Sequence, residues 1–257
     1  MILDRIVERK KQEVEALSHI TVQRRPDRSF LEALKKPKRK GAVIAEVKKA
    51  SPSKGVFTEQ FDPVDIARSY EEAGADALSV LTDRDFFQGD PAYIRKIKEA
   101  VSLPVLRKDF LIDKKQIDES VELGADAVLL IAAILTPETL GHFFRYAKSL
   151  GLDVLVEVHS KEELEAVINE CEPDLLGINN RNLKTFETSL IKTKEVAASV
   201  PDGSLLISES GIHTSEDAAQ VLSYGARGML IGESLMLAID KREKLNDLFK
   251  GAAKGEA

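Results

Sequence analysis

The sequence lacks the residue patterns that mark membrane proteins, secreted proteins and cysteine-rich metal sites. It contains one cysteine, Cys171, which excludes an internal disulfide, and we expect this side chain to fill apolar space. No apolar run is long enough for a transmembrane helix. Residues 1–6 are charged from the fourth position onward and lack the apolar stretch of a signal peptide. These absences predict a soluble, cytoplasmic protein without a membrane partner.

Three signatures of particular chemistries are also missing. The four histidines have neither HxH nor HExxH spacing, so we expect no metal site. No Gly-x-Gly-x-x-Gly loop follows the first apolar run, which argues against a dinucleotide cofactor. No serine–histidine–acid motif of a nucleophilic hydrolase stands out. Acid–base chemistry by carboxylates and lysines remains, and both residue types are abundant.

The formal net charge of −6 is unevenly distributed. Residues 24–40 carry eight cations and two anions, a local charge of +6, which leaves −12 for the rest of the chain. This basic segment contains a single aromatic residue, Phe30, and the acidic remainder would repel nucleic acid. We therefore expect no nucleic-acid partner. We interpret the segment as a solvated basic face, or as a patch that attracts an anionic small molecule.

Short apolar runs alternate with segments of helical period over most of the chain. The strand-like runs are 42–47, 76–81, 103–107, 126–131, 152–158, 174–179, 204–209 and 227–231. The helical segments between and after them are 63–73, 91–100, 114–123, 137–149, 160–169, 189–199, 214–224 and 241–250. Two further helices, 1–18 and 28–36, precede the first strand.

One helix–strand junction occurs three times, at 72–78, 122–128 and 223–229, and each copy has a glycine where a helix would end. Eight strand–helix units with a recurring junction predict an α/β fold, the (β/α)₈ TIM barrel. An open, doubly wound sheet is the alternative, which the missing glycine loop disfavours.

The 257 residues suit one large domain or two small ones. We expect a single barrel domain over 1–257, with an N-terminal helical extension over 1–40 and the barrel itself over 41–250. The residues after Lys250 are expected to form a frayed tail.

In such a barrel, functional side chains lie at the carboxyl ends of the strands. Those ends carry Glu46 and Lys48, Thr82 and Asp83, Arg107–Phe110, Glu157 and His159, Asn179–Asn182, Ser208–Gly211, and Gly232–Ser234. Glu46 and Lys48 are two residues apart and should point to the same side. From residue types alone, they are either a structural ion pair or part of a functional site.

Two glycine turns, Ser210-Gly211 and Gly232-Glu233, follow the seventh and eighth strands. Many barrels bind phosphate at this place through backbone N–H groups. We therefore predict a phosphate site there.

The longest motif, Glu46-Val-Lys48-Lys-Ala-Ser51-Pro-Ser-Lys-Gly55, resembles the signature of the indole-3-glycerol-phosphate synthases, barrel enzymes of tryptophan biosynthesis. The similarity continues, in chain order, at Leu106–Phe110, Val156–His159, Gly177–Leu183, Ser208–Ile212 and Ile231–Met236. The chain departs from the family pattern in the loop after the second strand, at Arg84 and Asp90.

The resemblance implies the conversion of 1-(2-carboxyphenylamino)-1-deoxyribulose 5-phosphate into indole-3-glycerol phosphate, with loss of carbon dioxide and water and without a cofactor. It implies that Lys108 is the general acid and Glu157 its partner. The other catalytic residues that it implies are Glu46, Lys48, Asn179 and Glu209. The implied substrate-binding residues are Ser51, Phe87, Phe110, Leu129 and Arg181, and the implied phosphate-binding residues are Ser210, Gly211, Gly232 and Glu233. A phosphorylated small molecule is the expected partner, and other enzymes of the tryptophan pathway are further candidates.

Two other functions stay open at this point. One is a different phosphate-binding barrel enzyme, a sugar-phosphate isomerase or an aldolase in which Lys108 or Lys48 forms an imine. The other is an inactive barrel that binds a phosphorylated ligand or a partner protein. The sequence also leaves open which of the two lysines gives the first proton.

Overall fold

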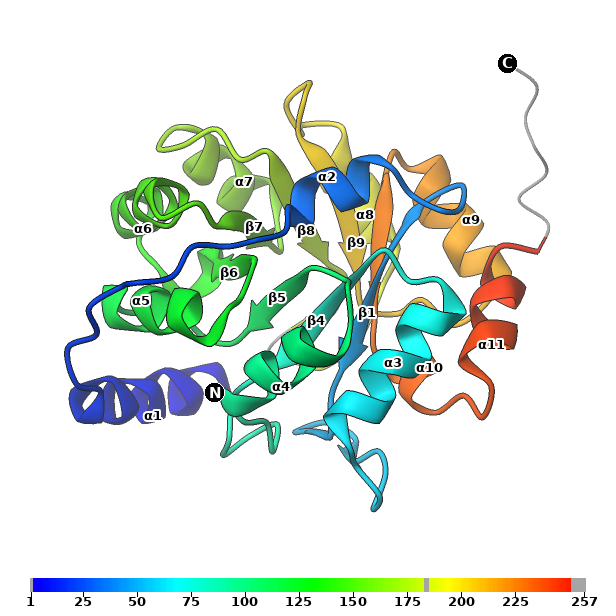
Figure 1. Ribbon diagram of the computed structural model, residues 1–257. Helices are drawn as coiled ribbons and strands as arrows, with labels where there is room; N and C mark the ends of the chain where they lie inside the picture. Colours follow the sequence, from blue (N-terminus) through cyan, green and yellow to red (C-terminus); the bar gives the residue numbers. More distant parts are fainter. Residues whose placement is uncertain (1, 183–184, 251–257) are drawn as a thin grey trace.

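In the computed structural model, which describes residues 2–182 and 185–250, eight parallel strands close into a barrel (Figure 1). The strands are β1 (Ala42–Val47), β4 (Ala77–Leu81), β5 (Val105–Lys108), β6 (Ala127–Ile131), β7 (Asp153–Val158), β8 (Leu175–Asn179), β9 (Leu205–Glu209) and β10 (Gly228–Ile231). Their order around the barrel follows the sequence, and β10 pairs with β1 to close it. The predicted (β/α)₈ barrel is confirmed.

The outer helices follow the strands in the predicted alternation. They are α3 (Pro63–Ala73), α4 (Ala92–Ala100), α5 (Lys114–Leu123), α6 (Pro137–Ser149), α7 (Lys161–Ile168), α8 (Ile191–Ala197), α9 (Ser215–Ser223) and α11 (Lys241–Leu248). Capping side chains begin several of them, as Asp62 does for α3 and Asp113 for α5. Gly74 and Gly124 end the same two helices in the left-handed conformation, at φ 86° and 91°. The recurring junction is therefore a helix stop followed by a buried strand, as expected.

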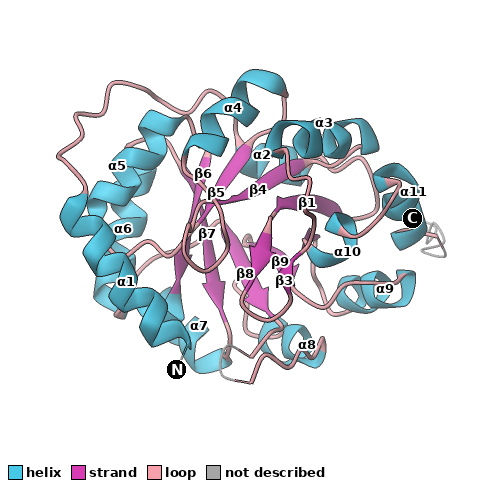
Figure 2. Ribbon diagram, turned by 90° about the horizontal axis from the view of Figure 1, so that it is seen from below, coloured by secondary structure: helices cyan, strands magenta, loops and turns pink. Residues whose placement is uncertain are grey.

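The N-terminal extension covers both ends of the barrel. The second helix, α2 (Phe30–Lys35), packs Phe30, Leu31 and Leu34 against the side chains that fill the barrel interior, at the amino ends of the strands. The first helix, α1 (Ile2–Ala16), lies at the opposite end, where the strands finish (Figure 2). The chain between them runs along the outside of α5 and α6 (Figure 1).

The basic segment has a structural use that differs from both interpretations of the sequence. Arg28 donates to the carbonyl oxygens of Lys98, Val101 and Leu103, at the end of α4. Arg39 does the same at the end of α3, through the carbonyls of Ala73 and Gly74. Barrel helices end beside the amino ends of the strands, where a guanidinium satisfies the last carbonyls and the negative end of the helix dipole. A freely solvated face is therefore wrong for these two arginines.

Some elements were not predicted. A two-stranded hairpin, β2 (Ala50–Ser51) and β3 (Gly55–Val56), occupies the loop after β1. A 3₁₀ turn (Ala132–Ile134) follows β6, and a short helix, α10 (Glu233–Met236), follows β10. The first helix ends at Ala16 rather than at residue 18. The tail predicted after Lys250, like Met1, Leu183 and Lys184, lies outside the described residues.

The single cysteine, Cys171, is buried in the core, as expected. A search of the described residues finds no helix with both the length and the apolar character needed to span a bilayer.

Candidate active site

The carboxyl ends of the strands, which point towards the viewer in Figure 2, surround a pocket. All fifteen residues that the sequence assigned to a site line it: Glu46, Lys48, Ser51, Phe87, Lys108, Phe110, Leu129, Glu157, Asn179, Arg181, Glu209, Ser210, Gly211, Gly232 and Glu233. They come from every barrel strand or from the loop that follows it. The barrel thus brings together side chains up to 187 positions apart, since Glu46 and Glu233 share the same cavity.

Lys108 is the centre of the polar part of the pocket. Its Nζ lies 2.7 Å from Oε2 of Glu209 and 3.3 Å from Oε2 of Glu157. Burial disfavours the ammonium, but the two carboxylates outweigh that cost and raise the pKa of Lys108, so the group stays protonated. Burial raises the pKa of Glu209, whereas the charge of Lys108 lowers that of Glu157 against the effect of burial. The two carboxylates therefore differ in how readily they hold a proton.

A second ion pair stands beside the first. Lys48 contacts Oε2 of Glu46, as expected for two charged residues on one side of a strand end. The Lys48 ammonium also lies over the ring of Phe57, 5.4 Å from its centroid. Phe57 follows the hairpin and lines the pocket, which the sequence did not suggest.

Asn179 orients the residues around it. Its Nδ2 donates to Oε1 of Glu157 at 3.2 Å, while its Oδ1 accepts from the backbone of Arg181 and from Oγ of Ser210. This amide therefore links the acid–base cluster to the turn after β9. In that turn, Ser210 and Gly211 both have positive φ, 68° and 83°. Successive residues of this kind leave backbone N–H groups available for an anion.

The two ion pairs together form a charged cluster of Glu46, Lys48, Lys108, Glu157 and Glu209. An apolar slot lies in the same pocket. The rings of Phe87 and Phe110 contact each other in a tilted arrangement, with centroids 5.9 Å apart and an angle of 38° between their planes, and Leu129 lies in the same pocket. Three residues of α1, namely Ile2, Leu3 and Ile6, complete the apolar lining. A flat hydrophobic group can pack against such a wall, in the same pocket as the two glycine turns.

Among residues 2–182 and 185–250, no three His, Cys, Asp or Glu side chains are grouped as metal ligands. The pocket carboxylates instead face lysines.

A family model for indole-3-glycerol phosphate synthase matches residues 3–248. The chain belongs to the indole-3-glycerol phosphate synthase family. The synthase of Geobacillus kaustophilus is 52% identical over 249 residues, which make up 96% of each chain. That of Shouchella clausii is 49% identical and covers 98% of this chain and 99% of its own. That of Priestia megaterium is 51% identical, covering 96% of this chain and 97% of its own.

Among solved structures, thiamine phosphate pyrophosphorylase from Pyrococcus furiosus is similar with a TM-score of 0.59. It is 17% identical and covers 82% of this chain and 94% of its own. At this identity the likeness shows the barrel fold alone.

This member of the synthase family has a buried ion cluster that the sequence did not reveal. Lys10 of α1 is 1% exposed, and its Nζ lies 2.9 Å from carboxylate oxygens of both Asp83 and Asp109. Asp83 accepts the backbone N–H of Phe87, and Asp109 accepts that of Phe110. The Lys10 ammonium thus joins α1 to the two loops that carry the rings of Phe87 and Phe110. The pattern of α1 predicted a helix, but a lysine in its apolar stripe gave no sign of its distant partners.

The carboxylate of Glu233, at the predicted phosphate site of this synthase-family barrel, also has partners. It lies 3.1 Å from Nζ of Lys54 in the hairpin and 3.9 Å from Arg181. Both cations thus lie beside the turn that carries Glu233. A phosphate could exchange with the carboxylate for them.

Arg84 and Asp90, the two residues that depart from the synthase pattern in the loop after β4, form an ion pair with each other. Nη2 of Arg84 lies 3.5 Å from Oδ1 of Asp90. Neither residue lines the described pocket, so the change stays on the surface of the loop.

Proposed function

We propose that the protein converts 1-(2-carboxyphenylamino)-1-deoxyribulose 5-phosphate into indole-3-glycerol phosphate, as a carbon–carbon lyase of tryptophan biosynthesis. The observation that carries this proposal is the placement of the Lys108 ammonium. It stands between two carboxylates at the junction of the apolar slot and the charged cluster. The substrate has the matching parts in the same order, namely an aromatic ring, a keto sugar and a phosphate.

Ring closure is the first step. The ring carbon that bears the carboxylate attacks the sugar carbonyl, and negative charge develops on the carbonyl oxygen. Lys108, which its neighbours keep protonated, stabilises this charge and donates a proton to the oxygen. Phe87 and Phe110, which contact each other and line the pocket, form the apolar wall against which the attacking ring packs.

Loss of carbon dioxide and of water follows. The bond to the carboxyl carbon breaks, and its electron pair restores the aromatic ring. We assign the holding of this carboxylate to Lys48, which lines the same pocket as Phe87 and Phe110. In the dehydration, the hydroxyl leaves as water with a proton from a lysine, and Glu157 accepts the proton released from the neighbouring sugar carbon. Glu157 must be ionised for this step.

Imine chemistry is the rival function for this pocket. A lysine forms an imine only from its neutral amine, which enzymes obtain by lowering the pKa. The carboxylates around Lys108 act in the opposite direction. This argues against the aldolase alternative at that residue.

The experiment is a fluorescence assay for the indole product with the purified protein. The expected result is product formation from the anthranilate-derived substrate, without added metal or cofactor. In parallel, borohydride is added with a keto-sugar phosphate. A covalent adduct on Lys108 or Lys48, together with no indole from the first substrate, would replace the proposal by the aldolase function.

We place the protein in the cytoplasm, where a phosphorylated substrate of this kind is retained. Other enzymes of the tryptophan pathway are the partners that we propose for it.

A further inference from the structure

The imidazole of His159 lies beside the carboxylate of Glu157 and outside the pocket. His159 comes directly after β7 and two residues after Glu157, and its side chain is 10% exposed. Its Nε2 is 3.4 Å from Oε1 of Glu157, and its Nδ1 is 3.3 Å from Oε2 of Glu163 in the first turn of α7. His159 is absent from the described pocket lining, so it can affect the reacting groups only through Glu157.

The two oxygens of Glu157 have different partners. Oε2 faces Lys108, whereas Oε1 accepts from Asn179 and faces His159. The Nε2 of His159 is buried and has no aligned hydrogen-bond partner among the described residues. A buried nitrogen in this state is unfavourable, and a small turn of the ring towards Oε1 would satisfy it.

The cluster holds more negative than positive charge when His159 is left out. Glu46, Glu157 and Glu209 supply three carboxylates, and among the residues that the structure describes Lys48 and Lys108 are the only other charges that pair with them. Neighbouring carboxylates do not all stay ionised unless enough cations face them. At a pH above the raised pKa of Glu209, when all three carboxylates are ionised, a third cation at Oε1 of Glu157 would balance the cluster.

We propose that His159 is a positioning residue that carries a proton in the resting enzyme and keeps Glu157 ionised. The charged groups that face its ring are Glu157 on β7, Glu163 on α7 and Lys192 on α8. Burial disfavours the imidazolium and Lys192 opposes it. The Glu163 hydrogen bond and the two carboxylates outweigh both and raise the pKa of His159. As the pH rises through this raised pKa, the ring loses its charge and its effect on Glu157.

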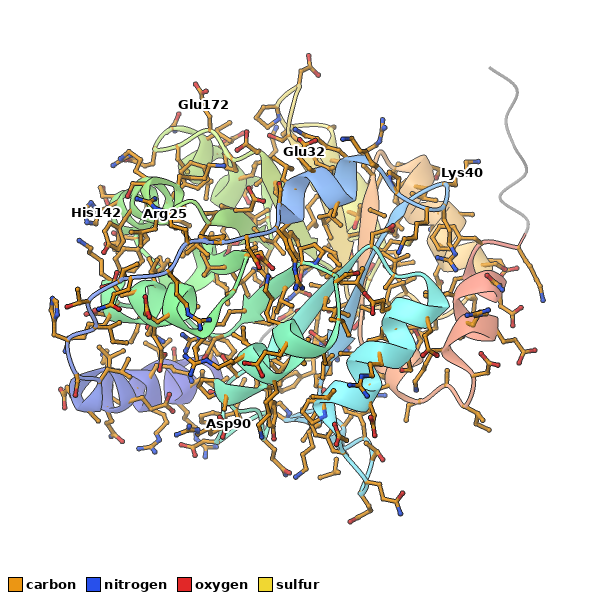
Figure 3. All side chains as sticks on the ribbon, in the orientation of Figure 1. Arg25, Glu32, Lys40, Asp90, His142 and Glu172 are labelled. Atoms are coloured by element: carbon orange, nitrogen blue, oxygen red, sulfur yellow. The ribbon has the colours of Figure 1, made fainter. Side chains whose placement is uncertain are left out.

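The first test measures turnover against pH, and it rests on the proposed function, in which Glu157 accepts a proton. His159→Gln keeps a nitrogen near Oε1 but cannot become a cation. Without that charge the pKa of Glu157 rises, so the acid limb of the kcat profile should move to higher pH by about one unit. The matched control is His142→Gln, on the outer side of α6 (Figure 3), which should leave the profile in place. If the pH profile of His159→Gln coincided with that of the wild type, the inference would be overturned.

The second test does not depend on turnover. The titration of the His159 ring is followed by NMR in the wild type and in Glu157→Gln. Loss of the facing carboxylate should lower the midpoint of this titration by about one unit. An unchanged midpoint would show that His159 serves only the packing of α7. A wild type that makes no indole would refute the proposed reaction, while this titration would still decide the pairing of His159 and Glu157.

Discussion

Gly177 in β8 and Gly232 directly after β10 make room for two carboxylates of the pocket. A Cβ on Gly177 would collide with Oε1 of Glu209, and one on Gly232 would collide with Oε2 of Glu46. Gly232 has a φ of −110°, which any residue can adopt, so space rather than backbone freedom requires glycine there. At both positions, the absence of a side chain leaves the space that a neighbouring carboxylate occupies.

Gly177→Ala should therefore reduce activity without preventing folding. The added methyl group pushes Glu209 away from Lys108, and a displacement of about 1 Å in a catalytic group can cost 10²-fold in rate. Steady-state kinetics and thermal unfolding measure the two effects. Gly141→Ala in α6, whose methyl would meet Glu170 far from the pocket, is the control and should keep full turnover. Equal turnover in both variants would contradict this role of Gly177.

At the scale of the element, α1 is both a wall of the pocket and a partner of two loops. Lys10→Met removes the cation between Asp83 and Asp109 and leaves both carboxylates buried. Removal of one partner from a buried ion pair costs about 3 kcal/mol of unfolding free energy. We also expect KM to rise more than kcat falls, because α1 lines the ring site and does not touch the charged cluster.

Lys11→Met is the matched control for this experiment. The Lys11 side chain is 60% exposed and pairs only with Glu8 of the same helix among the described residues. Its loss should change stability by less than about 0.5 kcal/mol. Urea unfolding and kinetics on both variants decide the matter, and equal effects of the two changes would show that α1 is not held by Lys10.

The basic segment makes a separate prediction for stability. Arg28→Ala leaves three carbonyl groups at the end of α4 without their donor, which should cost about 1–3 kcal/mol of unfolding free energy. Turnover should not change, because Arg28 lies at the opposite end of the barrel from the pocket. Lys36→Ala is the comparison for urea unfolding, since Lys36 is in the same segment but exposed, and within the described part of the chain it pairs only with Glu32. A loss of activity at full stability would contradict this structural use.

At the scale of the whole molecule, most of the architecture followed from local signals. Buried parallel strands are continuous apolar runs, and the glycines and caps at the helix ends set the boundaries to within a few residues. The β2–β3 hairpin was not predicted, because each of its strands has only two residues and Val56 is exposed, so no alternation of buried side chains marks it. The N-terminal extension was expected, but its contacts were not, because Lys10 and Asp109 are 99 positions apart.

In the pocket, too, contacts between residues far apart in the sequence could be predicted only in part. Motif resemblance and the rule that barrel sites lie at strand ends selected fifteen residues that the structure brings together. Ile6, Phe57 and Phe186 were missed although they line the same cavity. Apolar side chains carry no chemical signature in a sequence, and only the folded arrangement tells a pocket wall from a core. The roles assigned to the fifteen residues remain predictions.

The central claim is that Lys108 supplies the proton and the positive charge for ring closure. The most direct measurement is the turnover of Lys108→Met in the indole fluorescence assay, with Lys161→Met on α7 as an exposed control. Loss of a general acid that also stabilises charge predicts a kcat lower by about 10²–10⁴-fold, with the control unchanged. A Lys108→Met enzyme that turns over within tenfold of the wild type would contradict the claim.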